Sequence, residues 1–247
     1  MKAKHYYMFN ERILEQFQGN SLNKDNWDIL RIDDEPGPFS IERDIESYER
    51  TCMSASEYEY AAEQIQDLLM SKQMDARKMI SLGAGKGILE WHLKRKMPEM
   101  IIECTDYTVK AVQQLKSVFK FLDAAYPFDM LKGDYSLLDE NAVFLMYRVS
   151  TEFGVNEWYS IFESMHKAQI LSIIFVPTEL ASLGDMIGEN IEHIKNVMKG
   201  KRDICCGWLY SEREFLKIFK GKGNKALYVV KDKIYFDNTA IFVLERN

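Results

Sequence analysis

Apolar residues along the chain follow two different spacings, and the change between them falls near residue 77. Before that point, in residues 13–17 and 58–69, apolar positions recur every three or four residues. That spacing places apolar side chains on one face of a helix. Asn10 is a predicted helix N-cap, and the proline-containing stretch 33–38 is a predicted loop. Residues 1–77 are therefore predicted to form a helical N-terminal cover.

From about residue 78, short apolar runs alternate with segments of helical spacing. The predicted strands are Met79–Leu82, Ile101–Thr105, a weak third strand at Met130 and Leu131, Ala142–Val149 and Ile170–Val176. The segments between them carry the three-to-four-residue spacing of helices. Strands that are apolar throughout are typical of a parallel sheet with helices on both faces. The pattern therefore predicts an α/β fold.

The last third of the chain ends the sheet differently. A helix is predicted over Leu180–Met198, and a second begins after its cap residue Ser211. Three more strands are predicted at Ala226–Val230, Ile234–Phe236 and Ala240–Leu244. The last two are separated by three residues, which is too short for a parallel crossover. They are predicted to form an antiparallel hairpin.

Composition narrows the class of protein. The 247 residues are 47% hydrophobic and 28% charged, with a net charge of −6, which is typical of a globular protein. Apolar runs stay below the roughly 18 residues of a membrane span, and the first residues lack a signal-peptide core. The four cysteines and four histidines lack zinc-ligand spacing. These features predict a cytoplasmic protein with no membrane association and no metal.

The most informative segment is Ile80-Ser81-Leu82-Gly83-Ala84-Gly85-Lys86-Gly87-Ile88, which lies between a predicted strand and a predicted helix. Glycines there allow a sharp turn and close approach to a ligand, and a helix N-terminus attracts negative charge. The spacing is GxGxG. The dinucleotide fingerprint GxGxxG would need glycine or alanine at Ile88, so a nicotinamide oxidoreductase is disfavoured.

Two acids follow at the ends of later strands. Asp106 comes 23 residues after Gly83, where a carboxylate can accept hydrogen bonds from both hydroxyls of a ribose. Tyr107 follows it, in a position to lie against an adenine. Asp134 comes after the weak third strand and could accept from the adenine amino group, although a turn role beside Gly133 is an equal alternative.

These residues together resemble the class I S-adenosylmethionine-dependent methyltransferases, and the resemblance covers residues 78–247. It implies a Rossmann-like sheet of seven strands in the order 3-2-1-4-5-7-6, with an insertion at 179–208. It also implies that S-adenosyl-L-methionine is the cofactor. The implied cofactor-binding residues are Gly83, Gly85 and Gly87 around the methionine part, with Ser81 and Ala84 of the same segment, Asp106 at the ribose, and Tyr107, Asp134 and Tyr135 on the adenine side.

Methyl transfer requires an aligned acceptor and, for a hydroxyl, removal of its proton. Ligands of open α/β sheets lie beyond the carboxyl ends of the strands. The candidate catalytic residues are Tyr147, Arg148 and Glu152 after the fourth strand and His193 in the insertion. The motif Asn/Asp-Pro-Pro-Tyr/Phe, which marks methyltransferases of adenine or glutamine nitrogen, is absent after that strand.

Charge is unevenly distributed and bears on the acceptor. Residues 195–225 carry a net charge of +6, and residues 1–77 carry −7. The basic segment could attract a phosphate-bearing acceptor or RNA, although a solvated loop and helix face is the preferred interpretation. The acidic cover argues against nucleic acid. The preferred hypothesis is O- or N-methylation of a small molecule. The alternatives are an RNA or protein methyltransferase and a non-catalytic partner subunit that binds the cofactor.

Overall fold

The computed structural model describes residues 3–9, 11–17, 19, 22, 24–32, 39–71, 77–202, 204–223, 225–236 and 238–247. The predicted cap Asn10 and the predicted loop 33–38 lie outside these residues. Contacts divide the chain into two compact units. The first unit comprises residues 1–27, 134–140 and 146–247, and the second comprises 28–133 and 141–145.

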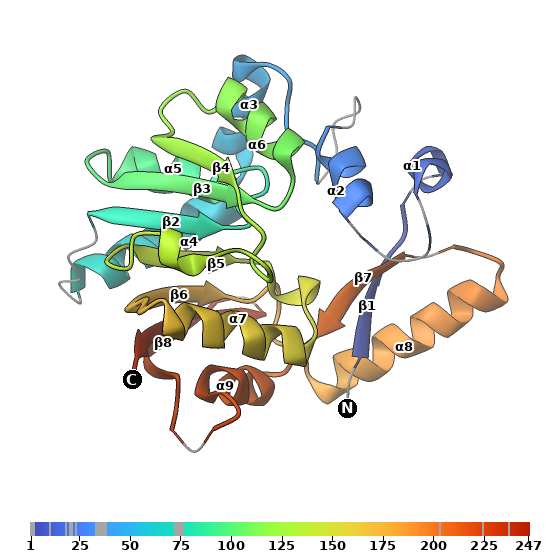
Figure 1. The fold of residues 1–247 in the computed structure, drawn as a ribbon. Helices are drawn as coiled ribbons and strands as arrows, with labels where there is room; N and C mark the ends of the chain where they lie inside the picture. Colours follow the sequence, from blue (N-terminus) through green and yellow to red (C-terminus); the bar gives the residue numbers. More distant parts are fainter. Residues whose placement is uncertain are drawn as a thin grey trace. The chain divides into compact units, whose positions relative to one another are not determined.

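A seven-stranded sheet with the order β4-β3-β2-β5-β6-β9-β8 is the main feature of the fold (Figure 1). β2 pairs in parallel with β3 and β5, whereas β9 runs antiparallel to both β6 and β8. The predicted strand order and the predicted C-terminal hairpin are confirmed. The bounds are Lys78–Leu82 for β2, Ile101–Asp106 for β3, Ala124–Pro127 for β4, Val143–Tyr147 for β5, Ser172–Val176 for β6, Tyr228–Phe236 for β8 and Thr239–Arg246 for β9.

Helices precede the sheet in the sequence and alternate with its strands. The N-terminal helices are α1 (Glu11–Gln16), α2 (Lys24–Arg31), α3 (Ile45–Ser54) and α4 (Ser56–Ser71). The later ones are α5 (Ile88–Lys96), α6 (Val109–Val118), α7 (Val155–Lys167), α8 (Leu183–Met198) and α9 (Glu212–Lys220), with short 3₁₀ turns η1 (Tyr135–Leu137) and η2 (Ser150–Glu152).

In the second unit, β2 is buried on both faces, as its continuous apolar sequence predicts. Met79, Ile80 and Leu82 are fully buried. Helix α6 has a buried stripe that includes Leu115, and it begins at the N-cap Thr108, whose hydroxyl accepts a hydrogen bond from the backbone of the first turn. Because these strands are buried and mostly apolar, their positions could be predicted from the sequence.

In the first unit, an aromatic cluster fills the space between helices and sheet. Phe162 of α7 and Phe175 of β6 both contact Phe219 of α9, with ring centroids 5.3 Å apart in each pair. Trp158 packs edge-on against Phe175 at 5.4 Å. Edge-to-face aromatic pairs at these distances stabilise a core beyond their buried area. Ser211 closes a capping box with Glu214 and so fixes the start of α9.

The third strand of the sheet is not where the apolar pattern predicts it. Met130 and Leu131 do not form a strand, and the third strand is β4, Ala124–Pro127. This strand is short, lies at the edge of the sheet and ends in proline, which suits a position where one side needs no hydrogen bond. Two alanines provide little apolar signal, which is why the pattern missed it.

A two-stranded antiparallel ribbon, β1–β7, was not predicted. β1 (Ala3–Tyr7) pairs with β7 (Ile204–Leu209), and both belong to the first unit (Figure 1). The ribbon packs against α8, where Met186 joins a buried cluster with Ala3 and Leu209. The two strands lie about 200 residues apart in the sequence, so neither has a local partner that a pattern could reveal.

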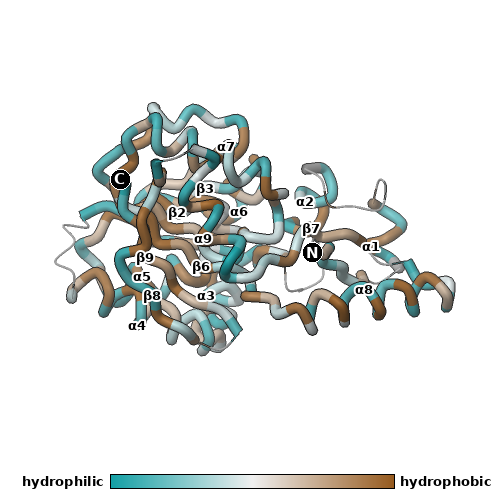
Figure 2. Tube along the Cα trace, turned by 90° about the horizontal axis from the view of Figure 1, so that it is seen from below, coloured by the Kyte–Doolittle hydropathy of each residue, from teal (hydrophilic) through white to brown (hydrophobic). Residues whose placement is uncertain are grey.

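Helix α8 carries the apolar residues that predicted it on an exposed face. Leu183, Ile187, Ile191 and Ile194 are 42–62% exposed, and brown segments recur along this helix in Figure 2. Its buried residues are Met186 and Asn196 instead. The apolar spacing therefore predicted a helix here, although the residues that provide the spacing are exposed. Among the described helices, none combines the length and apolar character needed to cross a bilayer.

Candidate functional site

The glycine loop between β2 and α5 has a backbone that requires glycine. Gly83, Gly85 and Gly87 have φ angles of 74°, 59° and 68°, in the left-handed region. The Ala84 N–H donates to the Thr105 carbonyl of β3 at 2.8 Å, and Gly87 is the N-cap of α5. The sequence motif thus forms a tight turn that opens onto a helix N-terminus, as predicted.

Asp106 ends β3 beside this loop, and backbone groups fix its carboxylate. Its Oδ2 accepts from the Gly85 N–H at 3.2 Å, and its Oδ1 accepts from the Thr108 N–H at 3.0 Å. The residue is only 7% exposed. An ionised carboxylate has about four acceptor positions, so two such bonds leave capacity for further donors. The arrangement suits recognition of a diol.

Arg31, the last residue of α2, lies over the same loop and was missed by the sequence analysis. Its Nη2 is 4.0 Å from the Asp106 Oδ2, and its Nη1 donates to the Phe39 carbonyl at 3.1 Å. A Cβ added to Gly85 would lie 2.9 Å from the Arg31 Nη2. The absence of a side chain at Gly85 is what allows the guanidinium to approach the loop.

A second set of contacts holds the loop from the side of α3. The Lys86 Nζ pairs with the Glu42 Oε1 at 2.9 Å, and the Tyr48 hydroxyl donates to the Lys86 carbonyl at 2.9 Å. Gln114 of α6 donates to the Glu42 carbonyl at 2.7 Å. Residues from the N-terminal helical region therefore fix the glycine loop within the second unit.

Ser81 of β2 contacts a buried acid. Its hydroxyl donates to the Glu90 Oε1, and Glu90 is 2% exposed. Loss of hydration disfavours the charged form and raises the pKa of Glu90 to about 7, against a usual 4.5. The Ser81 hydroxyl thus already donates a hydrogen bond to a residue of α5. Its role in cofactor binding stays a prediction.

Glu90 gives a testable dependence of stability on pH. The pKa of Glu90 is higher in the folded protein than in the unfolded chain. Its contribution to the free energy of unfolding is therefore complete below pH 4.5 and is lost as the pH rises through about 7. A shift of this size corresponds to about 3 kcal/mol. We expect the free energy of unfolding of Glu90→Gln, taken relative to that of wild type, to be higher at pH 8.5 than at pH 5. Urea unfolding at both pH values measures this difference.

The matched control is Glu99→Gln, which removes a charge from an exposed position of the same unit. It should follow the wild-type pH profile. If the free energy of unfolding depended on pH equally in Glu90→Gln and wild type, the buried acid would not be the source of that dependence.

The predicted adenine-side residues belong partly to the other unit. Tyr107, in the second unit, is 39% exposed. Asp134 and Tyr135 are in the first unit. The Asp134 Oδ1 accepts from the backbone N–H and the hydroxyl of Ser136, which lowers the pKa of the aspartate and caps η1. Tyr135 is buried. Asp134 therefore has the turn role that was its alternative, and its adenine role stays a prediction.

The candidate catalytic residues after β5 are Tyr147, Arg148 and Glu152, and the hydrogen bonds described here all lie within the first unit. Arg148 has a φ of 57°, which is uncommon for a residue other than glycine. Its N–H donates to the Val176 carbonyl at 2.8 Å, and its carbonyl accepts from the Thr178 hydroxyl at 3.0 Å. The Glu152 Oε2 accepts from the Trp27 indole at 3.1 Å. Tyr147 is half-buried at the end of β5.

His193 lies where the β1–β7 ribbon meets α8. Its ring stacks on Tyr6 with centroids 3.8 Å apart and planes 5° apart. Nearby, the His5 Nδ1 is 3.8 Å from the Glu189 Oε1. Partial burial raises the pKa of Glu179, although His5 counteracts this. The titratable groups His5 and Glu189 thus lie on the same strand and helix as the stacked pair Tyr6 and His193.

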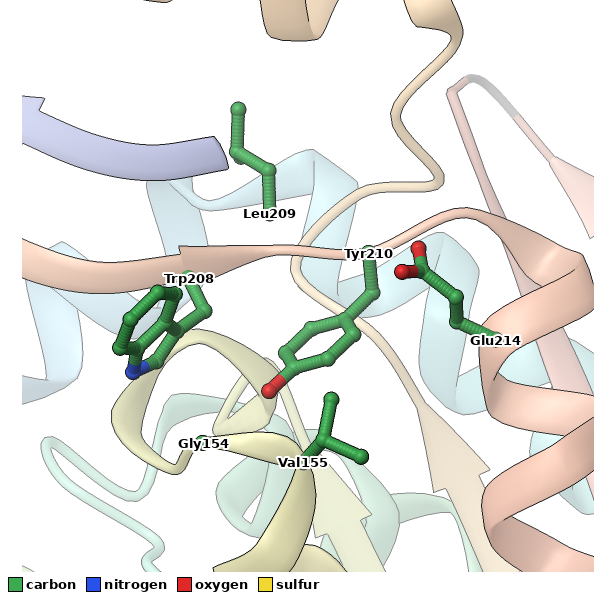
Figure 3. Close-up of a pocket in the computed structure, with 6 residues that line it drawn as sticks. All are labelled: Gly154, Val155, Trp208, Leu209, Tyr210 and Glu214. Carbon is green, nitrogen blue, oxygen red and sulfur yellow. The ribbon is translucent and has the colours of Figure 1, made fainter. Parts of the chain in front are cut away.

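A small pocket of the first unit lies between β7 and the start of α7 (Figure 3). Its volume is about 30 Å³, which accommodates roughly one water molecule and no organic acceptor. In Figure 3 the Trp208 and Tyr210 rings point toward Gly154 and Val155, whereas Leu209 points away. The Tyr210 hydroxyl donates to the Phe153 carbonyl. The pocket is therefore a packing feature.

Within the described ranges, no three His, Cys, Asp or Glu side chains gather as a metal site would require. The features that fit an adenosyl cofactor are different ones. The three left-handed glycines form a turn without side chains, and a backbone-bonded carboxylate stands beside them. A side chain at Gly85 would meet the Arg31 guanidinium. The residues present therefore fit S-adenosylmethionine.

No protein-family model and no curated protein matches the chain. Solved structures match it in fold. Magnesium protoporphyrin IX methyltransferase from Synechocystis, solved with bound SAH, is 13% identical at a TM-score of 0.53, and the match covers 96% of this chain and 100% of that one. The pyocyanin biosynthetic protein PhzM is 15% identical at a TM-score of 0.52 over 83% of this chain.

The match spans 62% of the length of PhzM. A third structure, from Rhodobacter sphaeroides and described as a zinc-dependent alcohol dehydrogenase, is 10% identical at a TM-score of 0.54, covering 73% of this chain and 88% of that one. At these identities the comparisons establish the fold. The Rossmann-like architecture that the resemblance implies is confirmed.

Proposed function

We propose that the protein transfers a methyl group from S-adenosylmethionine to an oxygen or nitrogen of a small molecule. One observation carries the proposal. Asp106 is fixed by the Gly85 N–H next to three left-handed glycines, so a diol-binding acid and a close-approach loop form one site. The bound SAH of the Synechocystis methyltransferase, which shares the fold, supports the choice of cofactor.

In this proposal the cofactor supplies an activated methyl group when bound, and the chain supplies position and proton transfer. Gly83, Gly85 and Gly87 hold the methionine part, and the Asp106 carboxylate accepts from the ribose hydroxyls. In the first unit, Glu152 or His193 takes the proton of the acceptor. Trp27 holds the Glu152 carboxylate in one orientation, and Tyr6 holds the His193 ring plane. Tyr147 and Arg148 orient the acceptor.

A small-molecule acceptor fits the charge pattern better than RNA does. Part of the basic segment has structural partners, since Arg202 donates to the carbonyls of Leu14 and Gly19 at 3.0 and 2.6 Å. Glu212, an acid of the same segment, accepts from Lys233 and Tyr235 of β8. The remaining lysines support an acceptor that bears phosphate. The names of the structural neighbours, which refer to pyocyanin and a porphyrin, support a small acceptor for this chain.

Two further predictions belong to the proposal. All four cysteines are free thiols, as is typical of a reducing compartment, which supports a cytoplasmic location. Residues 1–77 act as the cover that selects the acceptor, and residues 78–247 form the methyltransferase core with its insertion at 179–208. Limited proteolysis with and without SAH tests that boundary, since a cover should be protected when the ligand is bound.

Calorimetric titration tests the proposal directly. We expect the wild-type protein to bind SAH with micromolar affinity and to show no binding of NAD⁺ or NADP⁺ at the same concentrations. Transfer of a labelled methyl group to panels of phenols, amines and phosphorylated metabolites then identifies the acceptor. Binding of a nicotinamide cofactor in preference to SAH would overturn the proposal. Binding of SAH without transfer to any acceptor would favour the partner-subunit alternative.

A further inference from the structure

Helix α8 of the first unit is apolar on two sides. One side packs against β1, where Met186 is buried together with Ala3 and Leu209. On that side the His193 ring also stacks on Tyr6. The other side carries six large apolar side chains that are 42–83% exposed, namely Leu183, Ile187, Ile191, Ile194, Val197 and Met198.

The exposed side chains form a continuous line, called the α8 stripe below and made up of these six residues. Leu183, Ile187, Ile191, Ile194 and Met198 follow one another at intervals of four, four, three and four residues, which keeps them on one face of the helix. The 16 residues of α8 extend over about 24 Å. Single exposed apolar residues are normal, whereas a contiguous patch indicates an interaction surface. The spacing is that of helices which pack lengthwise against another helix.

Charges along α8 are separated by sign. Three acids lie within its first ten residues, namely Asp185, Glu189 and Glu192. Three lysines and no acid follow between residues 193 and 201, namely Lys195, Lys199 and Lys201. Lys195 contacts Glu192 of its own helix at 3.7 Å, but both side chains are more than half exposed.

This separation of charge fits a second copy of the same helix in the opposite direction. Antiparallel packing would bring the acidic end of each helix onto the basic end of the other, and it would align the helix dipoles favourably. Parallel packing would bring like charges together. An anionic lipid surface fits less well, because helices that lie on membranes carry mainly basic residues on their polar side.

We propose that two copies of this chain pair through the α8 stripe, as antiparallel helices related by a two-fold axis. In such an interface the same surface is used by both copies. The midpoint of the stripe lies beside Ile191, so the two copies of Ile191 face each other, and Leu183 faces the partner's Met198. The proposal does not rest on the proposed function, because the stripe contains none of the residues assigned to the cofactor or to proton transfer.

Sedimentation velocity of the full chain over the micromolar range tests the pairing. One helix pair is smaller than a standard interface of about 800 Å² per partner, so we expect a dimer with a micromolar dissociation constant. It should have twice the 28.9 kDa mass of one chain. Ile191→Glu places two carboxylates face to face at the centre and should weaken the dimer by at least about 30-fold. Met53→Glu is the matched control, since Met53 is an exposed apolar residue of α3 in the second unit, and it should associate like wild type.

Cross-linking tests the antiparallel direction and does not depend on the stability of Ile191→Glu. Under mild oxidation Ile191→Cys should form a disulfide with its own copy, because facing residues come within the roughly 7 Å between Cα atoms that the bond requires. Leu183→Cys should do so only when mixed with Met198→Cys. Wild type, with its four free thiols, gives the background.

Three results would overturn the proposal. The first is a wild-type protein that stays monomeric across the concentration range, and the second is an Ile191→Glu variant that associates as tightly as wild type. The third is a Leu183→Cys variant that cross-links to itself as fast as Ile191→Cys, which would mean a parallel arrangement. Binding of monomeric wild type to phosphatidylcholine–phosphatidylserine vesicles, lost in Ile191→Glu, would assign the α8 stripe to a lipid surface instead.

Discussion

Replacing Asp106 with asparagine is expected to weaken binding of SAH by about 10- to 100-fold, the usual cost of losing a charged hydrogen-bond acceptor. The carboxylate accepts from the backbone of Gly85 and Thr108. An amide at that position can keep one of these bonds, but its NH₂ group would meet an N–H donor at the other. The ribose hydroxyls would then meet a neutral, misdirected group. Calorimetry of the folded variant measures the change.

Asp67→Asn makes the same chemical change at an exposed position of α4. Its affinity for SAH should equal that of wild type. Equal affinities of Asp106→Asn and wild type would mean that the ribose is not held by this acid, and the site assignment would have to be abandoned.

Replacing Gly207 with alanine is expected to lower the free energy of unfolding by about 3 kcal/mol or more, within the range of severe steric and backbone effects. Gly207, in the middle of β7, has a φ of 130°, which a residue with a side chain rarely adopts. A Cβ there would overlap the Thr151 carbonyl of η2. Because the obstacle is backbone, either β7 or η2 must move. Urea unfolding measures the loss.

Gly188→Ala provides the comparison, since a Cβ at this position of α8 meets nothing within 4 Å. Alanine in a helix interior should raise stability by about 0.5–1 kcal/mol. If both alanine variants were stabilised alike, the close approach of β7 to η2 could not be part of the fold in solution.

The parts of the fold that were predictable are those in which burial is local and complete. β2 and β6 are short and mostly apolar, as expected of strands in a sheet with both faces covered. The C-terminal hairpin followed from a connection too short for any other pairing. β4 failed because Ala124 and Ala125 carry almost no apolar signal, and the nearby Met130 is buried without being in a strand.

The same distinction applies to the candidate site. Gly83–Gly87 and Asp106 were found because strand, loop and acid are consecutive parts of one motif. Arg31 and Glu42 were not found, because they reach the loop from a segment that precedes it by more than 40 residues. A single arginine or glutamate in a helical, acidic region is typical of a solvated surface. Only the three-dimensional path of the chain brings these charges to the glycine loop.

The β1–β7 ribbon has a consequence for biosynthesis. β1 is translated before β7, and its partner residues 204–209 follow about 200 residues later. At the usual rates of synthesis of about 5–20 residues per second, β1 waits some 10–40 s for its partner. During that interval the residues of the second unit, 28–133 and 141–145, have all been synthesised. β1 would therefore be among the last elements to obtain its partner, although it precedes the second unit in the sequence.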